Sequence, residues 1–317
     1  MSQHVNSDKI QKSFSSEEIM MDSKKPTFQG LLSTNSKLPI LGCHDALSAI
    51  IAEKAGFQAL WASSLGLSTA QGRRDAGELS WSEIVSLVGN ITEATNIPLL
   101  VDGDNGHGDF NIARLFAKKL NKAGASGIAI EDQVFPKRNS LMCADQELED
   151  IESFCGKIAA IKDSVGSDFT LVARIEALIV GENVDVALGR AHSYAEAGAD
   201  AVIIHAKSPD ATDVVTFVKS WNKPQPIILI PTTYHTSLAP HLRGLKVGGI
   251  IWANQMLRAQ VTALEMTARE LNNSQNPDAL GPMASVKDIF SLVGLDQLPK
   301  EELKYRRMTV RGALRHD

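Results

Sequence analysis

Short apolar segments alternate with amphipathic ones along most of this chain, and no other feature constrains the fold as strongly. The apolar segments have the length of buried strands, and the segments between them place apolar residues three and four positions apart, as amphipathic helices do. The predicted strands are 38–44, 59–63, 99–102, 127–131, 170–176, 201–205, 227–231 and 249–252. The predicted helices are 46–55, 81–94, 111–123, 148–163, 184–197, 212–221 and 257–271.

This order of elements predicts parallel pairing, because a helix between two strands carries the chain back to the edge where the first strand began. Gly56, Gly124 and Gly198 each stand at the end of a predicted helix, where glycine commonly terminates helices. Eight such units without a linker predict an α/β fold of the closed (β/α)8 TIM-type barrel. A doubly wound open sheet is the alternative, but it usually has fewer strands, and the first strand here lacks the G-x-G-x-x-G turn.

The pattern of residue types, rather than the length, divides the 317 residues into three parts. Residues 1–25 are rich in Ser, Lys, Asp and Glu and predict a mobile N-terminal tail. Residues 26–272 form the predicted barrel domain, and residues 273–317 form a C-terminal helical extension and tail. The extension has a helical pattern at 286–293 and could pack across a partner subunit, whereas its last ten residues could equally be a solvated tail.

Composition excludes several classes of function. The formal net charge is −5 and no basic stripe is present, which argues against a nucleic-acid partner. No apolar run reaches the roughly 18 residues of a membrane span, and residues 1–25 lack the apolar stretch of a signal peptide. Cys43, Cys143 and Cys155 have no C-x-x-C spacing, so neither a disulfide framework nor a cysteine zinc site is indicated. A reducing, cytoplasmic location is expected.

Acidic residues stand at the carboxyl ends of two neighbouring strands, where a parallel barrel collects its chemistry. Asp102 and Asp104 alternate to the same side, and Glu131 ends the next strand. Three carboxylates in one enclosed mouth repel each other unless a cation or shared protons neutralise them. Oxygen ligands without a His or Cys cluster favour Mg²⁺, with Mn²⁺ as a substitute. The alternative is that these acids cap helices or lie on surface loops, and Asp109 could simply cap the next helix.

Basic residues are expected on the other side of the mouth. Arg174 and His205 stand at the ends of two further strands, and Lys137 lies in the loop after the fourth strand. Such a cluster would bind a dianionic group such as phosphate or phosphonate, although a carboxylate would use the same side chains. The structural alternatives are an Arg174–Glu176 pair and a histidine that is part of the core.

The loop 133–146 is longer than the usual connection between a strand and its helix. Long loops over a barrel mouth are commonly lids, and Lys137, Asn139 and Ser140 could reach a bound anion when such a lid closes. A surface loop without a catalytic role is the alternative.

Seven segments carry a recognisable pattern, namely WASSLGLSTAQGRRDAGELSW, VDGDNGHGDF, IEDQVFPKRNSL, VARIEALI, GADAVIIHAK, IPTTY and WANQMLRA. In this order they resemble the phosphoenolpyruvate mutase branch of the isocitrate lyase superfamily, over residues 28–295. The resemblance implies a Mg²⁺-dependent isomerase that interconverts the small molecules phosphoenolpyruvate and phosphonopyruvate, the C–P bond-forming step of phosphonate biosynthesis. It also implies a homotetramer, a dimer of dimers that exchange the last barrel helix, 257–271, together with the residues after it.

The resemblance further implies roles for single residues. Asp102 is the expected direct Mg²⁺ ligand, with Asp104 and Glu131 holding the ion through water. Asp75 matches the carboxylate beside the transferring phosphoryl group. The expected phosphoryl-binding residues are Arg174 and His205, and the expected gating residues are Lys137, Asn139 and Ser140. The residues expected to contact the rest of the substrate are Trp61, Ser63, Ser64, Leu65 and Glu176.

Several reactions occur in this branch, so the fold alone cannot choose between them. Phosphonopyruvate hydrolysis is the main alternative, but hydrolases usually have Thr where Asn139 stands. A C–C lyase is disfavoured, because lyases carry a K-[KR]-C-G-H signature where this loop reads PKRNS, and Cys143 lies outside that signature. A silent structural subunit would need the loss of an acid or a phosphoryl-binding residue, and none is lost.

Four residues depart from the usual pattern of this branch. Gly103 replaces an alanine, Asn105 and His107 replace Thr and Tyr, and Gln133 stands where a lysine is general. The last three border the predicted site, so they leave room for a shifted substrate or a changed activity.

Overall fold

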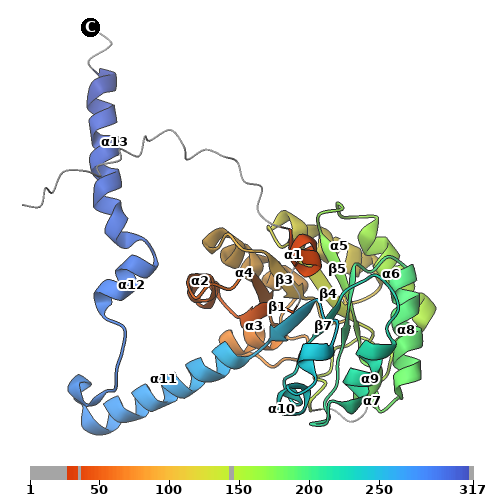
Figure 1. The fold of residues 1–317 in the computed structure, drawn as a ribbon. Helices are drawn as coiled ribbons and strands as arrows, with labels where there is room; N and C mark the ends of the chain where they lie inside the picture. Colours follow the sequence, from red (N-terminus) through yellow and green to blue (C-terminus); the bar gives the residue numbers. More distant parts are fainter. Residues whose placement is uncertain (1–26, 35–36, 143–145, 314–317) are drawn as a thin grey trace, which may run out of the picture.

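The structure is a computed structural model that describes residues 27–34, 37–142 and 146–313. Its centre is a closed barrel of eight parallel strands in chain order, in which β8 pairs with β1 (Figure 1). The strands are β1 (Leu38–Cys43), β2 (Ala59–Ala62), β3 (Leu99–Asp102), β4 (Gly127–Glu131), β5 (Thr170–Ile175), β6 (Ala201–Ile204), β7 (Ile227–Leu229) and β8 (Gly249–Trp252). The predicted (β/α)8 barrel is confirmed. Each strand begins at its predicted residue, and several end one or two residues early.

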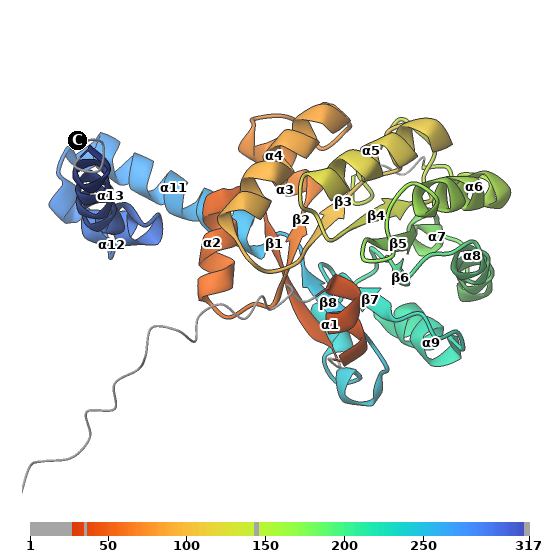
Figure 2. The same ribbon diagram turned by 90° about the horizontal axis from the view of Figure 1, so that it is seen from above.

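Helices form a ring around the barrel, as Figure 2 shows from above. The ring contains α2 (Ala46–Lys54), α4 (Trp81–Ala94), α5 (Phe110–Lys122), α6 (Ile151–Lys162), α8 (Val184–Glu196) and α9 (Thr212–Ser220). Shorter helices that the apolar periodicity did not predict are α1 (Phe28–Thr34), α3 (Ser64–Ala70), α7 (Ala177–Val180), α10 (His235–Leu238) and the 3-10 turn η1 (Leu242–Gly244). Most of these have only one or two turns, which is too short for an apolar period to be visible.

Two apolar layers hold the barrel together. Side chains such as Trp61, Leu100 and Ile228 fill its interior, and a larger layer packs between the strands and the ring of helices. Phe28 and Leu32 of α1 belong to the interior cluster, so α1 covers the end of the barrel at which the strands begin. The opposite end, where the strands finish, is left for polar side chains.

Helix starts follow local capping. Asp109 caps α5, because its Oδ1 accepts from the backbone N–H groups of Asn111 and Ile112 at 3.0 and 3.1 Å, as the capping alternative predicted. Helix α6 begins at Ile151 rather than at 148, because residues 147–149 pair with residues 132–134 before Asp150 caps the helix. Ser63 caps α3 by accepting from the backbone N–H of Gly66. Ser63 and Ser64 therefore form the junction between β2 and α3.

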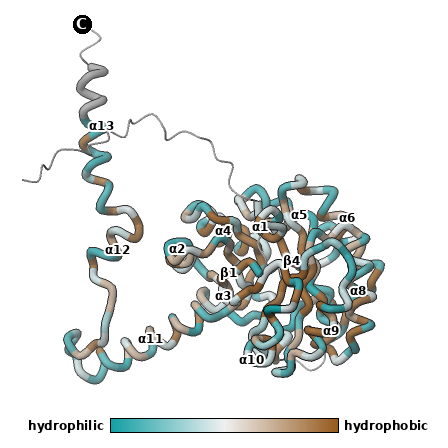
Figure 3. The backbone as a smooth tube through the Cα atoms, in the orientation of Figure 1, coloured by the Kyte–Doolittle hydropathy of each residue, from teal (hydrophilic) through white to brown (hydrophobic). Residues whose placement is uncertain are grey.

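The chain leaves the barrel after β8 and forms an arm of helices that extends away from it (Figure 1). The arm consists of α11 (Gln255–Ser274), η2 (Pro277–Ala279), α12 (Val286–Leu292), η3 (Leu295–Gln297) and α13 (Leu298–Ala313). The helical pattern predicted near 286–293 is confirmed as α12, and α13 occupies a region where a solvated tail was the alternative. Neither α11 nor α12 has a buried residue, and hydrophobic and hydrophilic stretches alternate along the arm (Figure 3).

Some predictions fall outside the part of the chain that the structure describes. The predicted tail at 1–25 and the loop residue Cys143 are among them. Cys43 and Cys155 are free thiols. Across the described ranges, no helix combines the length and the apolar character that crossing a membrane requires.

Candidate active site

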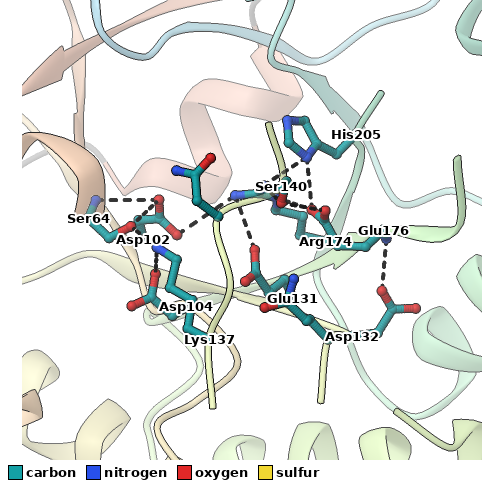
Figure 4. A network of polar contacts seen from close by, with 12 residues as sticks. Ser64, Asp102, Asp104, Glu131, Asp132, Lys137, Ser140, Arg174, Glu176 and His205 are labelled. Atoms are coloured by element: carbon teal, nitrogen blue, oxygen red, sulfur yellow. Dashed lines mark hydrogen bonds and ion pairs between the residues drawn. The ribbon is translucent and has the colours of Figure 1, made fainter. Parts of the chain in front are cut away.

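Side chains from the strand ends meet at one mouth of the barrel and line a cavity of about 70 Å³. The predicted site residues that line the cavity are Trp61, Ser63, Ser64, Leu65, Asp75, Asp102, Glu131, Lys137, Asn139, Ser140, Arg174 and His205. Asp104 and Glu176 are not among the lining residues, but they contact Lys137 and Arg174 (Figure 4). The structure therefore brings all the predicted site residues together, while their chemical roles stay predictions.

The acidic side of the mouth is formed by Asp102, Asp104 and Glu131. Asp102 ends β3 and Glu131 ends β4, and the backbone N–H of Glu131 donates to the carbonyl oxygen of Asp104 at 2.8 Å. Burial raises the pKa of Asp102 and of Glu131, although Lys137 and Arg174 act in the opposite direction. Glu131 Oε1 is buried without a hydrogen-bond partner among the described residues. Buried carboxylates in this position are stabilised by further positive charge.

Two side-chain cations of the protein face these acids. Lys137 Nζ contacts Asp104 Oδ1, and Arg174 Nη1 lies 3.4 Å from Glu131 Oε2 and 4.0 Å from Asp102 Oδ1. Within residues 27–34, 37–142 and 146–313, no three His, Cys, Asp or Glu side chains form a ready-made metal-binding group. The acids nevertheless supply only oxygen atoms, which fits a hard cation such as Mg²⁺ or Mn²⁺. A divalent ion would share these carboxylates with Lys137 and Arg174.

The turn after β3 explains one of the departures from the family pattern. A Cβ atom at Gly103 would lie 2.6 Å from Ile128 Cδ1 and 2.9 Å from the carbonyl oxygen of Ala129. An alanine at this position would therefore overlap the isoleucine that this chain has on β4. Asp104, the next residue, has a φ of +49°, a left-handed conformation uncommon for residues other than glycine, and its carboxylate contacts Lys137.

Arg174 is the centre of the basic side. Its Nε donates to Glu176 Oε1 at 2.5 Å, and its Nη2 lies 2.8 Å from His205 Nδ1. Ser140 Oγ donates to Glu176 Oε2 at 2.8 Å, so the loop 133–146 also reaches this carboxylate. Burial alone would raise the pKa of Glu176, but Arg174 and His205 hold it below its usual range, so the group is an ionised carboxylate. The Arg174–Glu176 pair thus forms, while Arg174 and His205 also line the cavity.

Lys137 and Asn139 of the loop after β4 contact Asp75, which lies between α3 and α4. Lys137 Nζ donates to Asp75 Oδ1 at 2.5 Å and to Ser64 Oγ at 2.5 Å, and Asn139 Nδ2 donates to Asp75 Oδ2 at 2.7 Å. Burial alone would raise the pKa of Asp75, but the ammonium of Lys137 lowers it. One ionised carboxylate therefore receives two side chains of the loop, as a closed lid requires.

Asp132 supports the site but was not among the predicted site residues. It is fully buried; its Oδ1 accepts from the backbone N–H of Glu176 at 2.8 Å, and its Oδ2 accepts from Tyr194 OH at 2.7 Å and Arg190 Nη1 at 3.1 Å. Burial raises the pKa of Asp132 to about 6. Its only signal in the sequence is its place directly after Glu131 at the end of a strand.

The wall of the cavity at β7 and β8 also contains residues that were not predicted. These are Ile230, Thr232, Ala253 and Asn254, together with Leu141 of the lid loop. Thr232 and Asn254 stand at predicted strand ends, but their residue types alone do not separate them from ordinary loop residues. Asn254 Oδ1 is buried and has no hydrogen-bond partner in the described part of the chain.

Asn105 and His107, two further departures from the family pattern, are not among the residues that line the cavity. His107 packs its ring edge-on against Phe116, with 5.0 Å between the ring centroids, and its Nε2 lies 3.8 Å from Asp104 Oδ2. Burial lowers the pKa of His107. Asn105 Oδ1 accepts from the backbone N–H of His107 at 3.3 Å. Both residues shape the turn that carries Asp104.

The barrel, with paired acidic and basic clusters at the carboxyl ends of its strands, defines an enzyme of the (β/α)8-barrel class. Comparison with known proteins gives the family. The family model described as phosphoenolpyruvate phosphomutase matches residues 28–272, and the chain belongs to this family.

Three relatives illustrate the similarity. The phosphoenolpyruvate phosphomutase of Streptomyces hygroscopicus is 42% identical over 278 residues, which cover 87% of this chain and 89% of that protein. The crystal structure of a phosphoenolpyruvate phosphomutase from Streptomyces platensis subsp. rosaceus is 37% identical, with a TM-score of 0.85 over 87% of this chain and 97% of that one. A phosphonopyruvate hydrolase solved with oxalate and Mg²⁺ is 34% identical, with a TM-score of 0.80 over 87% and 97%.

Proposed function

We propose that this protein interconverts phosphoenolpyruvate and phosphonopyruvate by moving a phosphoryl group between O2 and C3 of a pyruvate enolate. In one direction the O–P bond breaks and a C–P bond forms, and in the other the C–P bond breaks and the O–P bond forms. No atom is gained or lost, so water is not a reactant. The similarity to phosphoenolpyruvate phosphomutases, at 42% identity over most of the chain, supports this reaction.

The observation that carries the proposal is the closure of the lid loop on Asp75. Asn139 and Lys137 both donate to this carboxylate, and both line the cavity of about 70 Å³. A phosphoryl group released from an enolate is attacked by any water within reach, which would yield pyruvate and phosphate. A tightly closed lid therefore favours transfer within the substrate over hydrolysis.

The residues of the mouth have separate roles in this proposal. Arg174 and His205 bind the phosphoryl oxygens, because a guanidinium offers a fork of donors that matches them. Glu176 holds Arg174 and His205 in place and anchors Ser140 of the lid. Asp75, beside Ser64, lies where the phosphoryl group passes and either stabilises its passage or accepts it briefly as a nucleophile. Trp61 and residues 63–65 contact the pyruvyl part.

A Mg²⁺ ion, or Mn²⁺ in its place, is the proposed cofactor. Asp102, Asp104 and Glu131 would hold it, since all three offer carboxylate oxygens and Glu131 Oε1 is buried without a partner in the part of the chain described. When bound, the ion supplies the positive charge that stabilises an enolate. The phosphonopyruvate hydrolase of similar fold was solved with Mg²⁺, which supports the choice of metal.

Phosphorus NMR tests the reaction directly. Protein supplied with phosphonopyruvate and Mg²⁺ is expected to produce the signal of phosphoenolpyruvate, with little free phosphate. Phosphate and pyruvate as the sole products would assign the protein to hydrolysis instead, the reaction in the name of one solved relative. No change in either signal would overturn both assignments.

Replacing Asn139 by Thr is expected to raise the share of phosphate among the products several-fold. Threonine is shorter and cannot both donate to Asp75 Oδ2 and accept from the backbone N–H of Leu141, as Asn139 does at 2.7 and 3.0 Å. The lid would then admit water more often. The same substitution at Asn222, an exposed residue that precedes β7 at the other end of the barrel, is the control. An unchanged product ratio in N139T would show that this contact does not exclude water.

The arm is proposed to form the contact between subunits of a homotetramer, a dimer of helix-swapped dimers. Apolar side chains are exposed on the arm, including Leu264 at 60% and Phe290 at 43%, and Leu47 and Ile51 are exposed on α2 of the barrel at 46% and 41%. An arm from a neighbouring subunit would remove such side chains from water.

Sedimentation of the purified protein is expected to give the mass of four chains. Leu264→Asp should shift it to smaller species, because a charge would replace an apolar side chain in the contact between subunits. Asn272→Asp adds the same charge to the same helix at an exposed polar position and should leave the mass unchanged. A monomeric wild-type protein would contradict the proposed assembly without affecting the proposed reaction.

A further inference from the structure

The lid loop leaves the barrel through a short two-stranded neck. The backbone N–H of Val134 donates to the carbonyl oxygen of Glu147 at 3.0 Å, and the N–H of Glu149 donates to Asp132 at 2.9 Å. Gln133 and Leu148 face each other as an antiparallel bridge between these bonds. The neck is therefore fixed to the end of β4.

Two glutamines near the neck hold the backbone of a single lid residue, Arg138. Gln133 Oε1 accepts from the N–H of Arg138 at 2.7 Å, and Gln146 Nε2 donates to the carbonyl oxygen of Arg138 at 3.1 Å. Both glutamine side chains belong to buried residues, with exposures of 2% and 8%. The backbone of Arg138 thus has both its donor and its acceptor satisfied without belonging to a helix or a strand.

Neither glutamine has another use in the described part of the chain. Gln133 Nε2 and Gln146 Oε1, the second polar atom of each amide, are buried and have no hydrogen-bond partner there. Burial of such atoms is unfavourable, so a leucine or methionine would fill the same space at lower cost. The bonds to Arg138 are the contribution that only an amide makes at these two positions.

These bonds affect the site because of where Arg138 stands in the loop. It stands between Lys137 and Asn139, whose side chains donate to the two oxygens of Asp75. A backbone held at both its N–H and its C=O cannot slide or rotate, and its neighbours on either side keep their direction. The clamp therefore acts on the lid at the residue between its two contacts with Asp75.

We propose that Gln133 and Gln146 are positioning residues that clamp the backbone of Arg138 and so hold the lid closed over the site. They touch neither substrate nor reacting atoms and act through Lys137 and Asn139. The effect of the clamp on catalysis rests on the proposed phosphomutase reaction. Its effect on the lid does not.

Trypsin, which cuts after lysine and arginine, reports on the clamp without any reaction. Cleavage after Lys137 and Arg138 requires the lid to open, and Gln133→Met or Gln146→Met should speed it about tenfold relative to cleavage after the exposed Arg243. Gln225→Met is the matched control, because Gln225 Nε2 also donates to a backbone carbonyl, that of Ala195 at 3.5 Å, before β7 at the other end of the barrel. Unchanged cleavage after Lys137 and Arg138 in both lid variants would overturn the proposal.

Steady-state kinetics with phosphorus NMR then measure the consequence for catalysis. Both lid variants should lose about tenfold in kcat and release a larger share of phosphate, while Gln225→Met retains the wild-type values. A purely structural role would lower the melting temperature without changing the product ratio, and that result would overturn the proposed role. If a methionine variant does not fold, Gln133→Asn or Gln146→Asn takes its place, because each keeps an amide that is too short to reach Arg138. Trypsin cleavage and steady-state kinetics are then measured on that variant, with the same expected and contradicting results.

The two proposals fail separately. A wild-type protein that forms no phosphoenolpyruvate would overturn the proposed function, and the trypsin rates would still decide whether the clamp exists. Wild-type isomerisation with unchanged trypsin rates in the lid variants would overturn the clamp alone.

Discussion

Asp75→Asn is expected to lower kcat/KM by about 10³-fold or more while the protein remains folded. The carboxylate of Asp75 accepts from Lys137, Asn139 and Ser64, so a single side chain joins the lid to the floor of the mouth. Asparagine has nearly the same shape but no charge, and its NH₂ group would face the donors that Asp75 now accepts from. The phosphoryl group would lose the carboxylate beside its path, and the lid would lose the anchor that keeps water out. Initial rates from phosphorus NMR, with the melting temperature measured in parallel, check this.

The matched control is Asp200→Asn, in the turn before β6 at the other end of the barrel. Asp200 also accepts from a lysine, with Lys162 Nζ at 2.9 and 2.7 Å from its two oxygens, and from the backbone N–H of Leu171 at 2.8 Å. This substitution should reduce stability and leave kcat/KM within about twofold of the wild-type value. If the two variants lost activity to the same extent, the loss in Asp75→Asn would reflect a general effect of breaking a lysine pair.

The barrel could be predicted because buried parallel strands are continuous apolar runs, and polar residues begin where each run ends. The predicted start of each strand matches the observed start. The predicted seventh strand ran from 227 to 231, but β7 ends at Leu229. Ile230 and Pro231 were included because they are apolar, yet they lie beyond the paired part of β7. The acidic and basic residues of the mouth were predictable by the same logic, since Asp102, Glu131 and Arg174 all stand at strand ends. Alternation along a strand predicted Asp102 and Asp104 on one side of the mouth. The structure instead places Asp104 beyond the end of β3, in a turn with a φ of +49°.

The contacts made by the lid could not be predicted in this way. Lys137 and Asp75 are 62 positions apart, and both lie in irregular segments whose path follows no period. The roles of Asp132, Gln133 and Gln146 were also hidden, because each bonds to a backbone group, and the residue type of the partner gives no signal of such a bond. Family resemblance identified the lid residues, but it offered no reason why a glutamine should stand at 133. The geometry offers one, which is the bond to Arg138.

Ion pairs at the mouth connect its acidic residues to the lid. Lys137 contacts Asp104 as well as Asp75, and Arg174 faces Asp102 and Glu131 as well as Glu176. A divalent ion among Asp102, Asp104 and Glu131 would take over part of the charge that these two side chains now neutralise. Lys137 and Arg174 would then be freer to bind the phosphoryl group, which carries negative charge of its own.

Exhaustive removal of divalent cations is expected to abolish turnover, and Mg²⁺ is expected to restore it, with Mn²⁺ as a substitute. Desolvation works against the charged forms of Asp102 and Glu131, both of which are buried, so an added cation stabilises the charged site as well as an enolate. The loss should be about 10³-fold or more, because Lys137 and Arg174 are then the cations that the described residues place against the acids. Rates measured after chelation, and again after each metal is returned, check the expectation.

The melting temperature reports metal binding at the same site without requiring turnover. An ion that binds only the folded protein should stabilise it by about 2.7 kcal/mol at a concentration one hundred times its dissociation constant, which raises the melting temperature by a few degrees. Asp102→Asn should remove most of this rise, whereas Asp200→Asn, which carries the same change far from the mouth, should keep it. A protein that isomerises its substrate at full rate after chelation, with no response of the melting temperature to Mg²⁺, would show that Lys137 and Arg174 suffice. The acids at the ends of β3 and β4 would then serve to position those two side chains rather than to bind a metal.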